Sequence, residues 1–85
     1  MNCQPINFIS HTSGNQLYVS RFPDLSTEVD LHKLFSPFGK IRSIMMKPGF
    51  AFIDYERYED ADDCVFYLDG YYIENKRMVV QHASI

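Results

Sequence analysis

Two strand-like segments, residues 41–47 and 50–55, are joined by a very tight connection, Lys47-Pro48-Gly49, and this feature constrains the fold most. A connection this short joins antiparallel neighbours, because parallel strands need a crossover of about a dozen residues or more. The sequence therefore predicts a β-hairpin in the middle of the chain.

Helix-like segments flank this hairpin on both sides. Residues 27–36 follow Ser26, a suitable N-cap, and have acidic side chains near the positive end of the helix. The second helix is predicted over residues 58–68. Its apolar side chains recur at the spacing of one helix face: Ala61, Cys64, Val65 and Leu68.

Further strand-like segments lie at residues 17–19 and 77–82, the latter after a short hairpin that includes residues 71–73. The order is then strand, helix, strand, strand, helix, strand, which is the split βαβ arrangement. We predict an α+β fold, a ferredoxin-like β-α-β-β-α-β sandwich. Its four-stranded antiparallel sheet has two helices on one face. The side chains expected in the core are Leu17, Val19, Leu31, Leu34, Phe35, Ile44, Ala51, Ile53, Ala61, Val65, Leu68, Met78 and Val80.

A chain of 85 residues is long enough for one small domain. Residues 1–15 are polar and show no periodicity, so we expect a flexible N-terminal arm followed by a domain over residues 16–85. No apolar run approaches the roughly 20 residues of a membrane span, and the N-terminus lacks the pattern of a signal peptide. We therefore expect no membrane segment.

Alternation along the strands divides the side chains between two faces of the sheet. Tyr18, Phe50, Phe52 and Asp54 fall on the face opposite the small and branched residues. The three rings could be core covered by a helix, or an exposed platform on which unpaired bases stack. Two helices with one apolar face each cover a single side of the sheet, which favours the platform.

Two motifs resemble those of the RNA-recognition motif (RRM) family. Residues 47–55, KPGFAFIDY, resemble its octamer, and residues 17–22, LYVSRF, resemble its hexamer on the first strand. The resemblance covers residues 16–84 and implies that Tyr18, Phe50 and Phe52 stack on bases of single-stranded RNA. The octamer has Pro48 where the family has Arg or Lys, so the cation that would hold a phosphate there is missing, although Lys47 is adjacent.

The chain is similar in more detail to the first RRM of the SR (serine/arginine-rich) splicing factors, through residues 17–21, 47–49, 60–70 and 77–83. This resemblance implies a nuclear pre-mRNA processing factor, which could also shuttle to the cytoplasm, with spliceosomal or other RNA-processing proteins as partners. Its Arg/Ser-rich tail is absent from these 85 residues. By position it also implies RNA contacts at the end of the last strand: Gln81, His82, Ala83 and Ser84.

The formal net charge of −3 is unusual for a nucleic-acid binder, so the placement of the charges matters. The acidic residues gather on the predicted helices: Glu28, Asp30, Glu59, Asp60, Asp62 and Asp63. Basic residues fall at or beside the sheet: Arg21, Lys40, Arg42 and Lys47. Asp54 is the exception, and it could either accept a hydrogen bond from a base or repel phosphate. His82 could contact a base or have no role.

Two other classes of function remain as alternatives. An RRM whose surface binds a peptide instead of RNA is supported by the acidic pI of about 5.4, although the Arg-x-Phe element of such domains is replaced by Asn75-Lys76-Arg77-Met78. A small acyl-phosphate hydrolase has the same fold, but the sequence shows no phosphate loop, paired carboxylates or Cys/His ligand cluster. We expect no catalytic residue, metal, cofactor or small-molecule substrate.

Overall fold

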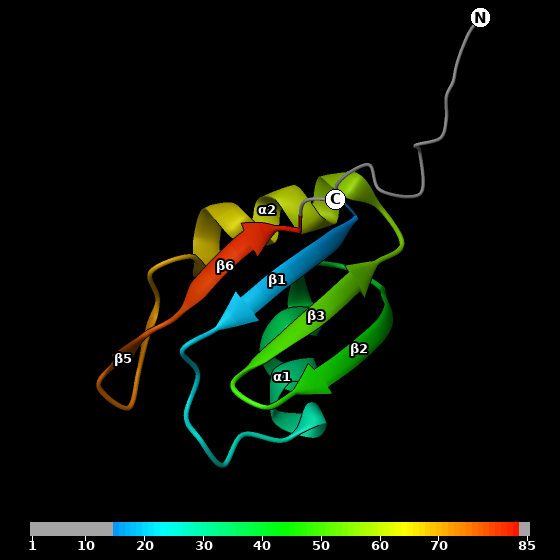
Figure 1. Ribbon diagram of the computed structural model, residues 1–85. Helices are drawn as coiled ribbons and strands as arrows, with labels where there is room; N and C mark the ends of the chain where they lie inside the picture. Colours follow the sequence, from blue (N-terminus) through cyan, green and yellow to red (C-terminus); the bar gives the residue numbers. More distant parts are fainter. Residues whose placement is uncertain (1–14, 84–85) are drawn as a thin grey trace, which may run out of the picture.

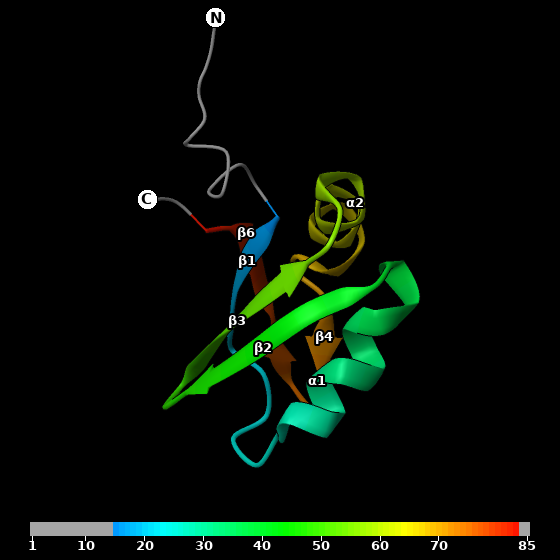
Figure 2. The ribbon, with the colours of Figure 1, turned by 90° about the vertical axis from the view of Figure 1, so that its right-hand side faces the viewer.

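The computed structural model describes residues 15–83, which form a sheet with both helices on one side (Figures 1 and 2). Figure 1 looks onto the sheet, with the helices behind it. The elements are β1 (Gln16–Ser20), α1 (Glu28–Phe35), the 3-10 helix η2 (Ser36–Phe38), β2 (Ile41–Lys47), β3 (Phe50–Tyr55), α2 (Tyr58–Leu68), β4 (Tyr72–Ile73), β5 (Lys76–Arg77) and β6 (Val79–His82).

The predicted element order and antiparallel sheet are confirmed. The four strands lie in the order β2-β3-β1-β6, and β1 and β3 are the central pair. The small hairpin of β4 and β5 precedes β6, as the sequence indicated. No helix within residues 15–83 combines the length and apolar character that crossing a membrane requires.

The start of α1 differs from the prediction, because Thr27 and not Ser26 is the N-cap. The Thr27 hydroxyl accepts a hydrogen bond from the Asp30 amide at 3.2 Å, and the Asp30 carboxylate accepts one from the Thr27 amide at 2.9 Å. Only Thr27 has an acidic residue three positions later to close this capping box. The Ser26 amide instead donates to the carbonyl of Pro23 at 2.9 Å.

The core lies between the sheet and the helices, and most of the predicted core is confirmed. Leu34, Ile44 and Val65 differ, because they are half-buried at its margin. Phe22 and Tyr55 are buried although they were not in the predicted set, and Cys64, predicted on the apolar face of the second helix, is buried as well. The full set of buried side chains is Leu17, Val19, Phe22, Leu31, Phe35, Ala51, Ile53, Tyr55, Ala61, Cys64, Leu68, Met78 and Val80.

Tyr55 links the sheet to the helix layer. It is fully buried at the end of β3, and its hydroxyl donates to the carbonyl of Phe35, the last residue of α1, at 2.5 Å. Burial raises the pKa of Tyr55 well above its usual range, and a hydrogen bond with Cys64 adds to this shift. Burial likewise raises the pKa of the Cys64 thiol to about 11, opposed in part by the same hydrogen bond. Both groups therefore stay neutral at physiological pH.

Replacing Tyr55 with phenylalanine should lower the free energy of unfolding by about 1–2 kcal/mol, because the buried Phe35 carbonyl loses its donor. Urea unfolding of the variant and the parent measures this difference. Tyr71→Phe is the matched control, since Tyr71 is about half exposed and should tolerate the change. Equal losses in the two variants would contradict a specific role for the Tyr55 hydroxyl.

The ends of the sheet define the limits of the described domain. Asn15, assigned to the arm from the sequence, bonds to β3: its carbonyl accepts from the Tyr55 amide at 2.9 Å, and its side chain donates to the carbonyls of Tyr55 and Glu56. At the other end, the Ala83 amide donates to the Gln16 carbonyl at 2.9 Å. Residues 1–14 of the predicted arm, and Ser84, lie outside the described residues.

Candidate nucleic-acid interface

The sheet face that the helices leave uncovered, called here the open face, presents side chains in rows that cross the strands. Directly paired residues of antiparallel strands point to the same face, so the register defines these rows. The middle row is Met45, Phe52, Tyr18 and Gln81. On one side of it lie Lys47, Phe50, Ser20 and Val79, and on the other lie Ser43, Asp54 and Gln16.

Three aromatic rings form the centre of the open face. Tyr18 on β1 lies opposite Phe52 on β3, and Phe50 is two residues before Phe52 on the same side of the strand. The ring centroids are 5.7 Å apart for Tyr18 and Phe50, 6.1 Å for Tyr18 and Phe52, and 5.6 Å for the two phenylalanines. Each ring is half-buried by its neighbours and no helix covers it (Figure 2). This ring cluster offers partly exposed aromatic surface to a ligand.

Basic side chains lie at one end of the ring cluster. Lys47 is paired with Phe50 at the edge of the sheet, and Arg21 follows directly after β1. Arg21 has a φ of 63°, a left-handed conformation that is uncommon for a residue with a side chain and ends the strand. Its Nε donates to the Arg77 carbonyl at 3.2 Å. A groove of about 370 Å³ opens here, lined in part by Arg21, Lys47 and Lys76.

The other end of the ring cluster carries Asp54. Its carboxylate lies 3.6 Å from a guanidinium nitrogen of Arg42, an exposed residue at the start of β2. This ion pair reduces the negative charge that Asp54 presents to a ligand. Gln81 lies at the β6 end of the middle row, paired with Tyr18, and is exposed. Both side chains can therefore offer hydrogen bonds next to the rings.

His82 lies on the other side of the sheet. It is paired with Leu17, a buried residue that points toward the helices. Its Nε2 is 3.1 Å from a carboxylate oxygen of Asp62 on α2, and its ring stacks on Tyr58 with centroids 5.5 Å apart. The structure thus brings Gln81 to the ring cluster and directs His82 to α2. Ala83 follows directly, with its amide bonded to Gln16.

Some residues of the open face were missed in the sequence. Met45 lies opposite Phe52 and is 51% exposed, so it extends the apolar surface beyond the rings. Ser43, Gln16 and Val79 complete the face. Alternation along residues 41–47 would have found Met45, because it lies two positions before Lys47 on the same strand and so shares its face. Outside the face, the Arg77 guanidinium lies 5.2 Å from the centre of the exposed Tyr72 ring.

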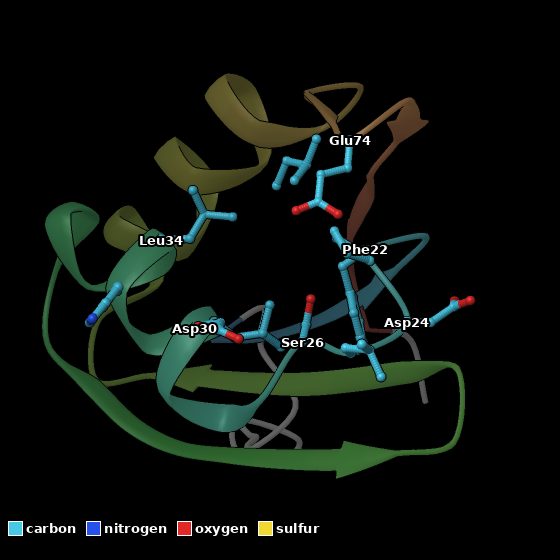
Figure 3. A pocket seen from close by; sticks show the side chains of 11 residues that line it. Phe22, Asp24, Ser26, Asp30, Leu34 and Glu74 are labelled. Atoms are coloured by element: carbon cyan, nitrogen blue, oxygen red, sulfur yellow. The ribbon is translucent and has the colours of Figure 1, made fainter.

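A larger pocket, of about 840 Å³, lies away from the open face, between α1, the loop before it and the β4–β5 hairpin (Figure 3). Figure 3 shows the Glu74 carboxylate directed into this pocket, near Leu34 and Phe22. Asp30 also lines it, but its carboxylate is engaged in the capping box of α1. No group of three or more His, Cys, Asp or Glu side chains suited to a metal ion occurs within residues 15–83.

A family model described as the RNA recognition motif matches residues 17–79, which is most of the chain. The chain belongs to the RNA recognition motif family. The match includes both strands that carry the ring cluster. The matched model describes a module for RNA recognition and not an enzyme, in agreement with the prediction from the sequence.

Splicing factors are among the curated relatives of this RNA recognition motif. It is 37% identical over 71 residues to serine/arginine-rich splicing factor 5 of mouse, covering 84% of this chain and 26% of the relative. It is 39% identical over 70 residues to serine-arginine protein 55 of Drosophila melanogaster, covering 82% and 19% respectively. The chain thus spans about a quarter or less of the length of these relatives.

Solved structures show the same fold. A Sxl-lethal protein–RNA complex contains a domain that superposes with a TM-score of 0.81 at 26% identity, covering 85% of this chain and 48% of that one. The NONO-1 homodimer of Caenorhabditis elegans gives a TM-score of 0.78 at 30% identity, covering 82% and 29%. The ferredoxin-like α+β fold of this RNA recognition motif is therefore confirmed.

Proposed function

We propose that this domain binds single-stranded RNA on its open face by stacking bases on Tyr18, Phe50 and Phe52. The observation that carries the proposal is the ring cluster: three partly exposed rings on the two central strands, with centroids about 6 Å apart. Every base has a π-face, and aromatic side chains on a sheet receive bases that are not stacked in a duplex.

The surroundings of the rings have complementary chemistry. Arg21 and Lys47 place positive charge at the groove beside Phe50, where the sugar–phosphate backbone of a stacked strand would run. Gln81, and Asp54 once its charge is offset by Arg42, can hydrogen-bond to base edges. Ala83 and Ser84, which continue from β6, are proposed as further contacts. This set supplies stacking for affinity and polar groups for base preference.

The names of the relatives suggest a biological process for the whole protein. Serine/arginine-rich splicing factor 5 of mouse is a curated relative named as a splicing factor, so we propose that the whole protein acts in pre-mRNA splicing or mRNA processing in the nucleus, with shuttling and RNA-processing protein partners as further expectations. A structural neighbour solved as a protein–RNA complex supports RNA as the ligand of the fold.

Single-stranded RNA should bind this domain at least about tenfold more tightly than a perfect duplex of the same sequence. A duplex keeps its bases stacked inside, and loss of one stacked base costs about 1–3 kcal/mol, where about 1.4 kcal/mol is tenfold. Fluorescence anisotropy with labelled strands, after selection of a preferred sequence from a random pool, measures both affinities. Equal affinity for the two forms would indicate recognition of backbone or shape and would overturn stacking.

Peptide binding instead of RNA binding remains the second candidate, and the pocket of Figure 3 favours it. Its lining combines apolar side chains, among them Leu34 and Ile73, with the Glu74 carboxylate and the highly exposed Leu25. A concave apolar surface with a few polar groups is the usual form of a binding site. Absence of any RNA affinity in the pool selection would make this candidate the preferred one.

A further inference from the structure

The outer face of α2 carries large aromatic side chains that the fold does not bury. Phe66 is 78% exposed and Tyr67 is 64% exposed. Both belong to α2, which lies on the side of the sheet opposite to the open face (Figure 2). Their rings contact each other edge to face, with centroids 5.0 Å apart, and Tyr67 stacks on Phe38 of η2 at 5.9 Å. Because Phe38 packs against the core, its contact with Tyr67 favours the observed orientation of the Tyr67 ring.

Negative charge surrounds these rings. Asp63 lies three and four positions before Phe66 and Tyr67, so its carboxylate is on the same helix face. Within residues 15–83 Asp63 forms no ion pair, whereas Asp62 is bound to His82 and Glu59 to Arg57. Together α1 and α2 carry six carboxylates and one lysine, Lys33, which is a formal charge of −5 on the helix layer.

We infer that the outer face of α2, formed by Asp63, Phe66 and Tyr67, binds an arginine-containing basic segment of a partner protein. A guanidinium is planar, so it can stack on the ring of Phe66 or Tyr67 while it donates to the Asp63 carboxylate. The ammonium group of a lysine would bind this surface less favourably, because it is compact and strongly hydrated. The charge of the helix layer attracts a basic segment and repels an RNA backbone.

This surface is separate from the proposed RNA site, so both can be occupied together. The open face and the helix layer lie on opposite sides of the sheet (Figure 2). The domain could therefore hold RNA on one side and a protein segment on the other. Phe66→Ser should accordingly leave RNA affinity unchanged, which distinguishes failure of this inference from failure of the RNA proposal.

The test uses a short capped peptide of alternating Arg and Gly residues, its Lys counterpart of equal charge, and its Glu counterpart. NMR titration should move the amide signals of residues 62–67 with the Arg peptide and move them less with the Lys peptide. Phe66→Ser should weaken the binding of the Arg peptide by about three- to fivefold, since exposed cation–π contacts are modest. Asp63→Asn should weaken this binding to a similar extent.

Val29→Ser is the matched control, because Val29 is an apolar residue on α1 that is 61% exposed and lies outside this surface. It should leave peptide binding unchanged, and urea unfolding should show that every variant is folded. Equal binding of the Arg and Lys peptides would reduce the effect to general electrostatics and overturn the inference. It would equally be overturned by peptide shifts on the open face, or by self-association of the domain through Phe66 and Tyr67.

Discussion

Replacing Phe50 or Phe52 with alanine should weaken the binding of single-stranded RNA by about 5- to 150-fold. The range follows from about 1–3 kcal/mol per stacked base, at about 1.4 kcal/mol for each factor of ten. Each ring is only half-buried and contacts the other two rings of the cluster. The loss of folding stability should therefore stay below the about 3–5 kcal/mol expected for a fully buried phenylalanine.

The measurement pairs an RNA titration with urea unfolding on the same samples. Phe66→Ala is the matched control, because it removes an exposed ring from the far side of the domain and should leave RNA affinity unchanged. The double variant at positions 50 and 52 should lose less than the product of the single effects, since the two rings touch. If both single variants stay folded and bind RNA like the parent, the stacking proposal fails and peptide binding becomes the preferred function.

Phe35→Ala should have the opposite pattern and lower the free energy of unfolding by about 3–5 kcal/mol. Phe35 is fully buried at the end of α1, and its carbonyl accepts a hydrogen bond from the Tyr55 hydroxyl on the sheet. Removal of the Phe35 ring would therefore open a cavity where the helix meets the sheet. A domain of this size has only several kcal/mol of stability, so a large fraction of the variant could be unfolded at 37 °C. Leu34 would be a weaker probe, because it is half-buried at the margin of the core.

Urea unfolding measures the free energy of unfolding of this variant and of the parent. Phe66→Ala is the control, because it makes the same chemical change at an exposed helix position. The control should differ from the parent by no more than about 0.5 kcal/mol. RNA affinity of the folded fraction of Phe35→Ala should equal that of the parent, because Phe35 lies on the helix side of the sheet. Similar losses of stability at positions 35 and 66 would contradict the placement of the core between the sheet and the helices.

The fold could be predicted from the sequence because its strongest signals are local. The short connection at Pro48-Gly49 predicted the central hairpin, and the alternation along residues 50–55 predicted which of its side chains share a face. Errors arose where a choice depended on neighbours. Both Ser26 and Thr27 suit an N-cap, and Asp30, three residues after Thr27, decides between them. Burial of the Tyr55 hydroxyl also needed the tertiary structure, because the carbonyl that accepts its hydrogen bond belongs to Phe35 on α1.

The candidate site was predictable where it depends on alternation within a strand, and unpredictable where it depends on contacts between elements. Alternation placed the three rings, and the antiparallel register then brought Tyr18 beside Phe52. The placement of His82 could not be read from the motif, because its direction depends on which residue of β1 it faces. That residue is Leu17, so the ring turns toward Asp62 on α2. The Arg42–Asp54 ion pair was likewise hidden, since it depends on a shift in register between Ile41 and Ser43.

That shift in register also protects the edge of the sheet. β2 is an outermost strand, and a flat edge of unpaired amides and carbonyls invites another chain to add a strand, which is a common route to aggregation. The irregularity between Ile41 and Ser43 interrupts the regular hydrogen-bonding pattern, and Arg42 and Lys47 add charge along the same strand. A domain that leaves apolar rings partly exposed on its open face is thereby shielded against β-addition by copies of itself.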